Sequence, residues 1–224
     1  IPRIDDPEYL NTILSICKKE KIKAVISLID PELNVLSKHR ELFESENIQL
    51  YLSEYEAIYK CYDKYKAFKA FKQANLPTPL TYENIESFNK DFNNGKINFP
   101  IIMKPRFGSG GKDVLLIHDR ANLELQWKNN NSYILQEYID VDIISREMIS
   151  IFPKERIHIR SGESDKAISI NDQKLFNLVE EMASKFNLIG PLCADIFMKD
   201  GQYYILEINP RFGGSYPMAH SCGI

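Results

Sequence analysis

The sequence lacks several features that would place it quickly in a functional class. No apolar run approaches the roughly 20 residues that a helix needs to span a bilayer, so no membrane association is expected. The formal net charge is −3, so there is no overall basic field to hold nucleic acid. The four cysteines are scattered and form no Cys-x-x-Cys pair, which favours reduced thiols in a cytoplasmic protein over disulfides or a zinc site.

The composition is otherwise ordinary for a globular protein. Of the 224 residues, 44% are hydrophobic and 26% are charged, enough to bury a core in one large domain or two smaller ones. The chain begins Ile1-Pro2-Arg3, which is neither an initiator methionine nor a signal peptide. We therefore expect residues to be missing before Ile1.

Alternating helix and strand patterns begin the chain. Apolar residues at helical spacing predict a helix over 7–20, and the runs 24–29 and 48–52 have the composition of buried strands. Such alternation is typical of a parallel α/β layer, in which ligands bind at the carboxyl ends of strands, where Asp30 would lie. Two or three strands are too few to complete such a domain, so we interpret residues 1–61 as part of a larger one.

The rest of the chain predicts a mixture of antiparallel strands and helices. We expect helices over 63–74, near 120–129 and over 173–187, and strands over 99–105, 113–117, 133–138, around 148–153, over 192–198 and over 203–209. Residues 139–147 lack a turn signal where one strand should reverse into the next. We expect that residues are missing from the chain there.

The last of these strands ends in the polar sequence Glu207-x-Asn209-x-Arg211. Side chains alternate faces along a strand, so these three would project to the same side. Carboxylate and amide oxygens suit a hard divalent cation, and a guanidinium is a bidentate donor to phosphate. The row predicts a site for metal-bound phosphate. The alternative is a solvated strand end that leads into an Asn-Pro turn.

A second acidic residue supports the metal interpretation. Asp195 lies twelve positions before Glu207, with Asp200-Gly201 between them as a typical hairpin turn. The hairpin would set Asp195 opposite Glu207 on one sheet surface. With Asn209, the two carboxylates would form an oxygen-rich site of the kind that holds Mg²⁺ together with substrate phosphates.

A glycine-rich segment over 104–113 reads Lys-Pro-Arg-Phe-Gly-Ser-Gly-Gly-Lys-Asp. Glycines let backbone N–H groups approach a phosphate closely, and the flanking cations add charge. The segment is not a Walker A loop, because Arg106 stands where the first glycine is required and Asp113 follows the lysine. A hairpin tip that binds no ligand is the alternative.

Taken in order, these motifs resemble the ATP-grasp superfamily, and within it proteins like the carbamoyl-phosphate synthase large subunit. The resemblance covers nearly the whole chain and includes Asp63-Lys64 and the strand Leu135-Gln136-Glu137-Tyr138-Ile139. It implies an α/β (α+β) ATP-grasp fold, in which two α+β subdomains grip ATP after an incomplete Rossmann-like domain. The implied boundaries are 1–61 for the preceding domain and 62–224 for the ATP-grasp domain, with a glycine-loop lobe over about 76–138 and a metal-binding lobe over 139–224.

The resemblance also implies a set of ATP-binding residues. The phosphates would be held by Lys64 and Lys104 and covered by the loop that contains Gly108, Ser109, Gly110 and Gly111. Adenine would be contacted by Glu137, Tyr138 and Ile139. The family's Gly-x-Glu after this strand, whose acid lies near the ribose, has no counterpart here.

In the same resemblance, Asp195, Glu207 and Asn209 match ligands of Mg²⁺, with Mn²⁺ as an alternative metal. Arg211 matches an arginine that stabilises an acyl-phosphate, and Lys104 would assist it in catalysis.

Cations are dense over residues 154–166, where Arg156 and Arg160 lie four positions apart. Such a pair could clamp a carboxylate or a phosphate, although a solvated charged loop is the alternative. In the resemblance this segment faces the acceptor substrate, so we favour an anionic substrate there.

The resemblance implies that ATP converts a carboxylate to an acyl-phosphate, which an amine then attacks. Three hypotheses follow: a standalone carboxylate–amine ligase, which we favour; a split component like the carbamoyl-phosphate synthase large subunit; or a nucleotide-binding module without turnover. The first two allow a homodimer or a partner subunit. The intact set of Asp195, Glu207 and Asn209 argues against the third.

Overall fold

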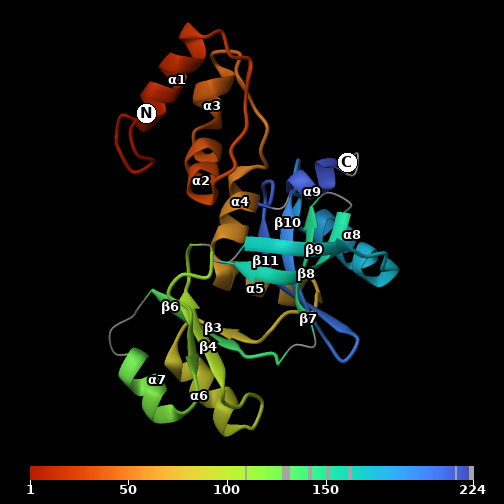
Figure 1. The fold of residues 1–224 in the computed structure, drawn as a ribbon. Helices are drawn as coiled ribbons and strands as arrows, with labels where there is room; N and C mark the ends of the chain where they lie inside the picture. Colours follow the sequence, from red (N-terminus) through yellow and green to blue (C-terminus); the bar gives the residue numbers. More distant parts are fainter. Residues whose placement is uncertain are drawn as a thin grey trace.

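The computed structural model describes residues 1–108, 110–127, 132–140, 143–149, 152–160, 163–214 and 216–221. Within these residues the strands form a two-stranded, a four-stranded and a five-stranded sheet, and each sheet contributes to a separate hydrophobic core. Figure 1 shows the resulting units: the N-terminal unit at one end, the four-stranded sheet at the other, and the five-stranded sheet beside them. The α+β fold expected from the sequence is confirmed.

The N-terminal unit is a small parallel α/β layer. It consists of α1 (Tyr9–Lys19), β1 (Ala24–Val25), α2 (Asp30–Lys38), α3 (Arg40–Glu44) and β2 (Gln49–Leu50), with β1 and β2 parallel. The core of this unit includes the fully buried Phe43 and Ile58. Both strands are shorter than the expected runs 24–29 and 48–52. In the first run, Ile26, Leu28 and Ile29 are exposed rather than buried against neighbours.

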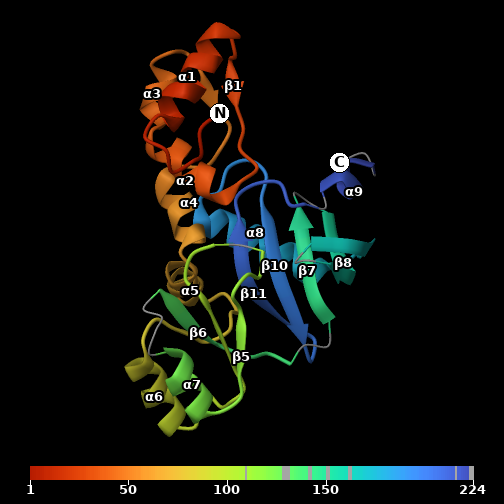
Figure 2. The same ribbon diagram turned by 60° about the vertical axis from the view of Figure 1, so that its left-hand side comes forward.

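Two consecutive helices connect this unit to the rest. The sequence did not predict α4 (Tyr55–Tyr62), which leads directly into the expected α5 (Lys64–Gln73). Figure 2 shows α4 descending from the N-terminal unit toward α5, with the strands β10 and β11 alongside. Asp63 is the single residue between the two helices. Its side chain caps α5 by accepting hydrogen bonds from the backbone N–H groups of Tyr65 and Lys66.

The four-stranded sheet has the order β3-β6-β4-β5 and is covered by two helices. Its elements are β3 (Thr81–Tyr82), α6 (Ile85–Asn93), β4 (Ile101–Pro105), β5 (Leu115–Ile117), α7 (Arg120–Trp127) and β6 (Tyr133–Glu137). Aromatic rings fill the core beneath, with Phe88 packing against Tyr82, Phe92 and Phe99 at centroid distances of 5.7–5.8 Å. Except for β3 and α6, these elements were expected from the sequence.

The five-stranded sheet has the order β11-β10-β7-β8-β9. Its strands are β7 (Ile143–Ile149), β8 (Phe152–Arg160), β9 (Glu163–Ser169), β10 (Cys193–Lys199) and β11 (Gln202–Asn209). The same part of the chain contains the helices α8 (Gln173–Phe186) and α9 (Tyr216–Ser221). Helices α5 and α8 share one core with β10 and β11, in which the Phe71 and Phe186 rings lie 5.0 Å apart. No helix in the described residues is long and apolar enough to cross a membrane.

One expectation for the middle of the chain was wrong. The single strand expected around 148–153 corresponds to the end of β7 at Ile149 and the start of β8 at Phe152. The cation-rich segment, for which a solvated loop was the alternative, lies in the antiparallel strands β8 and β9. Backbone pairing with neighbouring strands outweighs the polar composition, because each strand gains a hydrogen-bonding partner that the sequence pattern does not display. The expected loss of residues near 139–147 concerns 141 and 142, which lie outside the described residues.

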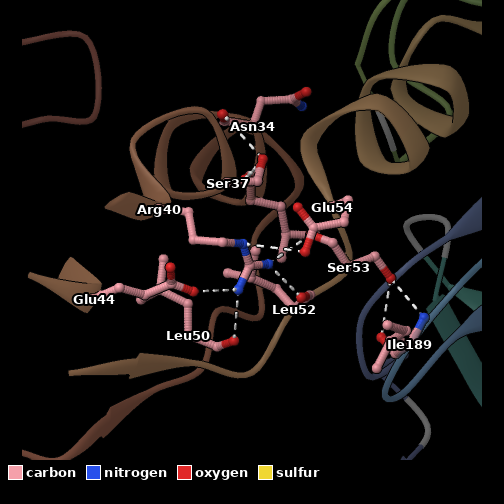
Figure 3. A network of polar contacts seen from close by, with 10 residues as sticks. Asn34, Ser37, Arg40, Glu44, Leu50, Leu52, Ser53, Glu54 and Ile189 are labelled. Carbon is pink, nitrogen blue, oxygen red and sulfur yellow. Dashed lines mark hydrogen bonds and ion pairs between the residues drawn. The ribbon is translucent and has the colours of Figure 1, made fainter. Parts of the chain in front are cut away.

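One arginine stabilises the end of the N-terminal unit (Figure 3). The guanidinium of Arg40 donates to the carbonyl oxygens of Leu50, Leu52 and Ser53 at 3.3, 2.7 and 3.1 Å. The adjoining Ser53 hydroxyl is fully buried and exchanges two hydrogen bonds with Ile189, donating to its carbonyl at 3.0 Å and accepting from its N–H at 2.8 Å. The segment after β2 is therefore fixed to α3 on one side and to the loop before β10 on the other.

Replacing Arg40 by lysine is expected to lower the free energy of unfolding by about 1–3 kcal/mol. The donors of a lysine ammonium do not have the planar, forked arrangement with which the guanidinium reaches these three carbonyl oxygens. Urea unfolding followed by circular dichroism measures the change. The matched control is Arg3→Lys, since the Arg3 side chain is 88% exposed and pairs only locally with Asp5. Equal stability of the two variants would contradict the role given to Arg40.

Candidate functional site

A cavity of about 750 Å³ lies between the four-stranded and five-stranded sheets. Both sheets and the glycine loop contribute to its wall, and the described lining residues that carry charge are Lys64, Lys104, Lys112, Asp113, Glu137, Arg156, Asp195 and Glu207. The cavity therefore collects most of the residues that the sequence motifs singled out.

The strand β4 supplies the buried cation of this cavity. Ile101 and Met103 are fully buried in the core of the lobe, so the alternate residues Ile102 and Lys104 face the cavity. Lys104 is only 6% exposed, and its ammonium donates to Gln136 Oε1 at 2.8 Å. Gln136 in turn donates to Thr81 Oγ1 at 2.9 Å. This chain of hydrogen bonds fixes the direction of the lysine.

The surroundings shift the proton equilibrium of Lys104. The pKa of Lys104 is lowered from 10.5 to about 8, mainly by burial and to a smaller extent by the charge of Lys64, while the negative charges of Glu207 and Asp195 oppose the shift. All four groups line the same cavity, although they come from α5 and from two different sheets. A desolvated ammonium of this kind interacts strongly with an anion that enters the cavity.

Lys64 is the first residue of α5, and its ammonium donates to the carbonyl oxygen of Gly108 in the glycine loop. Burial lowers its pKa, against the raising effect of Glu207, Asp30 and Asp63. Both lysines therefore line the same cavity, and the charge of Glu207 raises the pKa of each of them.

The glycine loop is anchored at its base. Asp63, which is 1% exposed, accepts two bonds of 2.8 Å from Arg106 Nε and Nη2 while it caps α5. Beyond this anchor Gly108, Gly110 and Gly111 have φ values of +105°, +75° and +66°. Side chains rarely adopt these values, so the loop depends on glycine for its course over the cavity.

The predicted hairpin that carries the candidate metal ligands is present. In the pairing of β10 with β11, Asp195 lies opposite Glu207 and Ile196 opposite Ile205, so Leu206 is an extra, bulged residue. Ala194, Ile196, Ile205 and Ile208 are buried in the core while Asp195, Leu206 and Glu207 line the cavity. The bulge lets two consecutive residues reach the cavity, a common use of bulges near functional sites.

Two polar neighbours complete this carboxylate pair. The Asn209 amide donates to Glu207 Oε1 at 3.5 Å, and Arg156 Nη1 donates to Asp195 Oδ1 at 3.4 Å. No group of three or more His, Cys, Asp or Glu side chains that could hold a metal was found among the described residues. The candidate ligand set is instead two carboxylates and an amide oxygen, which suits an oxygen-preferring cation.

Strand alternation predicts that Arg211 lies in one row with Glu207 and Asn209. This prediction is wrong, because Arg211 lies beyond the end of the strand. β11 ends at Asn209, and the N–H of Arg211 donates to the Asn209 carbonyl at 2.8 Å in a turn. Proline at position 210 cannot continue the strand ladder, which is the physical reason for the break. The Arg211 guanidinium instead forms two hydrogen bonds of 2.8 Å with Asp30 of the N-terminal unit.

The linker strand, which consists of the end of β6 and the two residues after it, contributes three wall residues, Glu137, Tyr138 and Ile139. The Glu137 carboxylate accepts a bond of 2.9 Å from the N–H of Leu80, so it already has a partner within the protein. Tyr138 is exposed and Ile139 is buried. Ser109 and the Arg160 side chain, the remaining predicted residues, lie outside what the structure describes.

Sequence reasoning missed the supporting contacts of the site. The sequence pattern assigns no role to Gln136 and gives no signal for Thr81. The capping role of Asp63 could have been predicted, because an aspartate directly before a helical pattern is a typical N-cap. Asp30 was expected at a ligand-binding edge, but no local pattern connects it to a residue 181 positions away.

An α+β fold whose two larger sheets enclose a common cavity defines the general class of this protein. The family model described as ATP-grasp domain matches residues 61–215, over half of the chain, and a model described as PylC-like, N-terminal domain matches residues 1–51. The chain belongs to the ATP-grasp family.

Comparison with individual proteins agrees with this assignment. The carbamoyl phosphate synthase large chain of Thermoanaerobacter pseudethanolicus is 24% identical over 98% of this chain and 22% of its own length. Thus the chain spans about a fifth of such relatives.

The solved structures that match share the fold. Biotin carboxylase from Campylobacter jejuni, in a complex named β-γ-ATP, has a TM-score of 0.79 at 16% identity, over 98% of this chain and 56% of that one. The L-amino acid ligase from Bacillus licheniformis has a TM-score of 0.74 at 19% identity, over 98% and 57%. Close structural neighbours of this chain are thus enzymes, and ligases are among them.

The affinity for ATP is expected to fall as the pH rises through about 8, the pKa of Lys104. Below this pH the protonated lysine would attract the phosphates of ATP, and above it the neutral lysine would not. Isothermal titration calorimetry between about pH 7 and about pH 9.5 measures the dissociation constant of ATP with Mg²⁺.

Two variants control this experiment. Lys104→Gln should bind weakly without a step near pH 8, whereas Lys72→Gln, on the exposed side of α5, should behave like the parent protein. A step that persists in Lys104→Gln would assign it to another group.

Proposed function

We propose that this protein is an ATP- and Mg²⁺-dependent ligase that activates a carboxylate as an acyl-phosphate for attack by an amine. The observation that carries the proposal is the convergence of opposite charges in one cavity. Lys64 and Lys104 come from α5 and the four-stranded sheet, Asp195 and Glu207 come from the five-stranded sheet, and all four line the same space. The charge of Glu207 raises the pKa of both lysines, and the charge of Asp195 raises the pKa of Lys104, which supports this proposal.

The cavity suits ATP in size and composition. Its volume of about 750 Å³ falls within the usual range for small-molecule sites. The apolar side chains of Ile102, Tyr138, Ile139 and Leu206 offer a surface for a planar base. In the proposed arrangement the linker strand holds adenine, and the two lysines and the glycine loop, Gly108 to Gly111, hold the phosphates.

The carboxylate end of the cavity suits Mg²⁺. Asp195, Glu207 and Asn209 would provide its oxygen ligands, and Mn²⁺ has the same preference for oxygen. When bound, the metal would neutralise charge on the phosphates and act as a Lewis acid.

The protein's own groups would do the remaining work by positioning and charge neutralisation. Lys64 and Lys104 would balance the charge that moves toward the departing ADP. The glycine loop would exclude water from the transferred phosphoryl group. Arg211, just beyond the metal-binding strand, would stabilise the phosphoryl group on its new oxygen.

An anionic acceptor would bind on the side of Arg156. Its guanidinium lines the cavity and contacts Asp195, so it lies next to the proposed metal. We assign Arg156 to the acceptor carboxylate, with Arg160 as its proposed partner on the same strand.

The chemical steps balance without a covalent enzyme intermediate. A carboxylate oxygen attacks the γ-phosphorus of ATP, the bond to the β-phosphate oxygen breaks, and ADP leaves. The amine nitrogen then attacks the carbonyl carbon of the acyl-phosphate, phosphate leaves with the C–O electron pair, and the nitrogen loses a proton. The product is an amide.

A second candidate is favoured by the relatives named as carbamoyl phosphate synthase large chains. In that case the chain would be a component of a larger enzyme, with a second copy or another subunit as its partner. Stimulation of ATP turnover by bicarbonate alone would support this candidate.

A screen of ATP turnover distinguishes the two. ADP release is measured with Mg²⁺ across pairs of carboxylates and amines, with bicarbonate as a separate arm. Release stimulated by one carboxylate and amine together would support the ligase. Failure of the protein to bind ATP, or to release ADP under any pairing, would contradict the proposal.

Glu207→Gln is expected to lower turnover by about 100-fold or more, because loss of a metal ligand's charge removes several kcal/mol of stabilisation. The matched control is Glu180→Gln, which changes an exposed carboxylate on α8. Initial rates at saturating ATP are compared over a Mg²⁺ titration. Unchanged turnover in Glu207→Gln would show that the metal assignment is wrong.

A further inference from the structure

We propose that Asp30 is a positioning residue, which holds Arg211 in place for phosphoryl transfer, so that the N-terminal unit completes the reaction site. This inference rests on the proposed function and extends it to a residue of a different unit. It concerns an aspartate that the reaction scheme above does not use.

The contact between the two side chains has the geometry of a specific pair. Arg211 Nε donates to Asp30 Oδ1 and Arg211 Nη2 to Asp30 Oδ2, both at 2.8 Å. A fork that meets both carboxylate oxygens fixes the plane as well as the position of the guanidinium. In a third hydrogen bond, Arg211 Nη1 donates to the carbonyl oxygen of the next residue, Phe212, at 2.9 Å. This bond further fixes the plane of the guanidinium.

The pair is shielded from water. The Asp30 side chain is 10% exposed and the Arg211 side chain 17%. Ion pairs on open surfaces contribute little, whereas shielding strengthens the attraction and makes loss of one partner costly. Asp30 therefore restricts Arg211 far more than a surface carboxylate would.

The position of the pair connects it to the site. Asp30 is the first residue of α2, the helix that follows β1. Arg211 lies just beyond the end of β11 at Asn209. A second, small cavity of about 20 Å³ has Asp30, Lys64, Glu207 and Asn209 among its lining residues. The charge of Asp30 also acts on Lys64. The aspartate thus belongs to the electrostatic surroundings of the proposed phosphate and metal groups.

Two other roles for Asp30 must be separated from positioning. The pair could serve only to hold the N-terminal unit in place, but Ser53 and Ile189 already connect the same units through two buried hydrogen bonds. Alternatively, Asp30 could bind the ammonium group of an amine substrate. Both of its carboxylate oxygens are engaged by Arg211, which favours positioning.

The test compares Asp30→Asn, Asp30→Glu, Arg211→Ala and the double variant Asp30→Asn/Arg211→Ala. Steady-state ADP release is measured with Mg²⁺, ATP and the carboxylate–amine pair found in the screen. Ser53→Ala is the matched control, because it weakens the connection between units without touching Arg211. Thermal unfolding and ATP affinity are recorded for every variant, so that a folding defect is recognised.

For Asp30→Asn we expect kcat to fall by about 10- to 100-fold, the usual effect of removing a residue that orients a functional group. KM for ATP should stay within about twofold of the parent, because Asp30 contacts Arg211 rather than the nucleotide. Asp30→Glu should recover part of kcat. The double variant should be no slower than Arg211→Ala, since the effect of Asp30 passes through Arg211. Ser53→Ala should lower the unfolding temperature and leave kcat unchanged.

Several results would overturn the inference. A normal kcat in Asp30→Asn, a further loss of rate in the double variant, or an equal loss in Ser53→Ala would each exclude positioning. An increase in KM for the amine alone would make Asp30 a substrate ligand instead. A parent protein without Mg²⁺-dependent ATP turnover would overturn the proposed function itself, whereas an active parent with a normal Asp30→Asn would overturn this inference alone.

Discussion

The register between β10 and β11 is the constraint on which the site and the main core both depend. One face of this hairpin places Ala194, Ile196 and Ile205 in the core shared with α5 and α8, and the other presents Asp195 and Glu207 to the cavity. A slip of one residue would exchange the two faces, with carboxylates entering the core and apolar side chains entering the cavity. Packing energy therefore enforces the alignment of the two candidate metal ligands.

The same hairpin makes a buried lysine tolerable. Lys104 loses most of its contact with water, and an isolated ammonium at such a position is unfavourable. The carboxylates on the facing sheet offset part of this cost, and the hydrogen bond to Gln136 satisfies one of its donors. The five-stranded sheet thus supplies part of the charge balance that the buried lysine of the four-stranded sheet requires.

Much of the fold and part of the site could be predicted, and the difference follows from sequence distance. The Asp200-Gly201 turn is a short-range signal for a hairpin, so the pairing of Asp195 with Glu207 could be predicted from the sequence. The β8–β9 hairpin was missed because its stability comes from neighbouring strands rather than from its own composition. The Asp30–Arg211 pair joins residues 181 positions apart, and neither carries any local sign of the other.

The bond from Lys64 to the Gly108 carbonyl gives the loop a second meaning. The lysine proposed to hold phosphate already has a partner, supplied by the segment proposed to cover that phosphate. Nucleotide binding would therefore be an exchange of partners rather than a simple gain, and the measured affinity would be the difference between two bonds. A looser loop would raise the affinity for ATP while weakening the cover over it, so binding strength and shielding of the phosphoryl group would oppose each other.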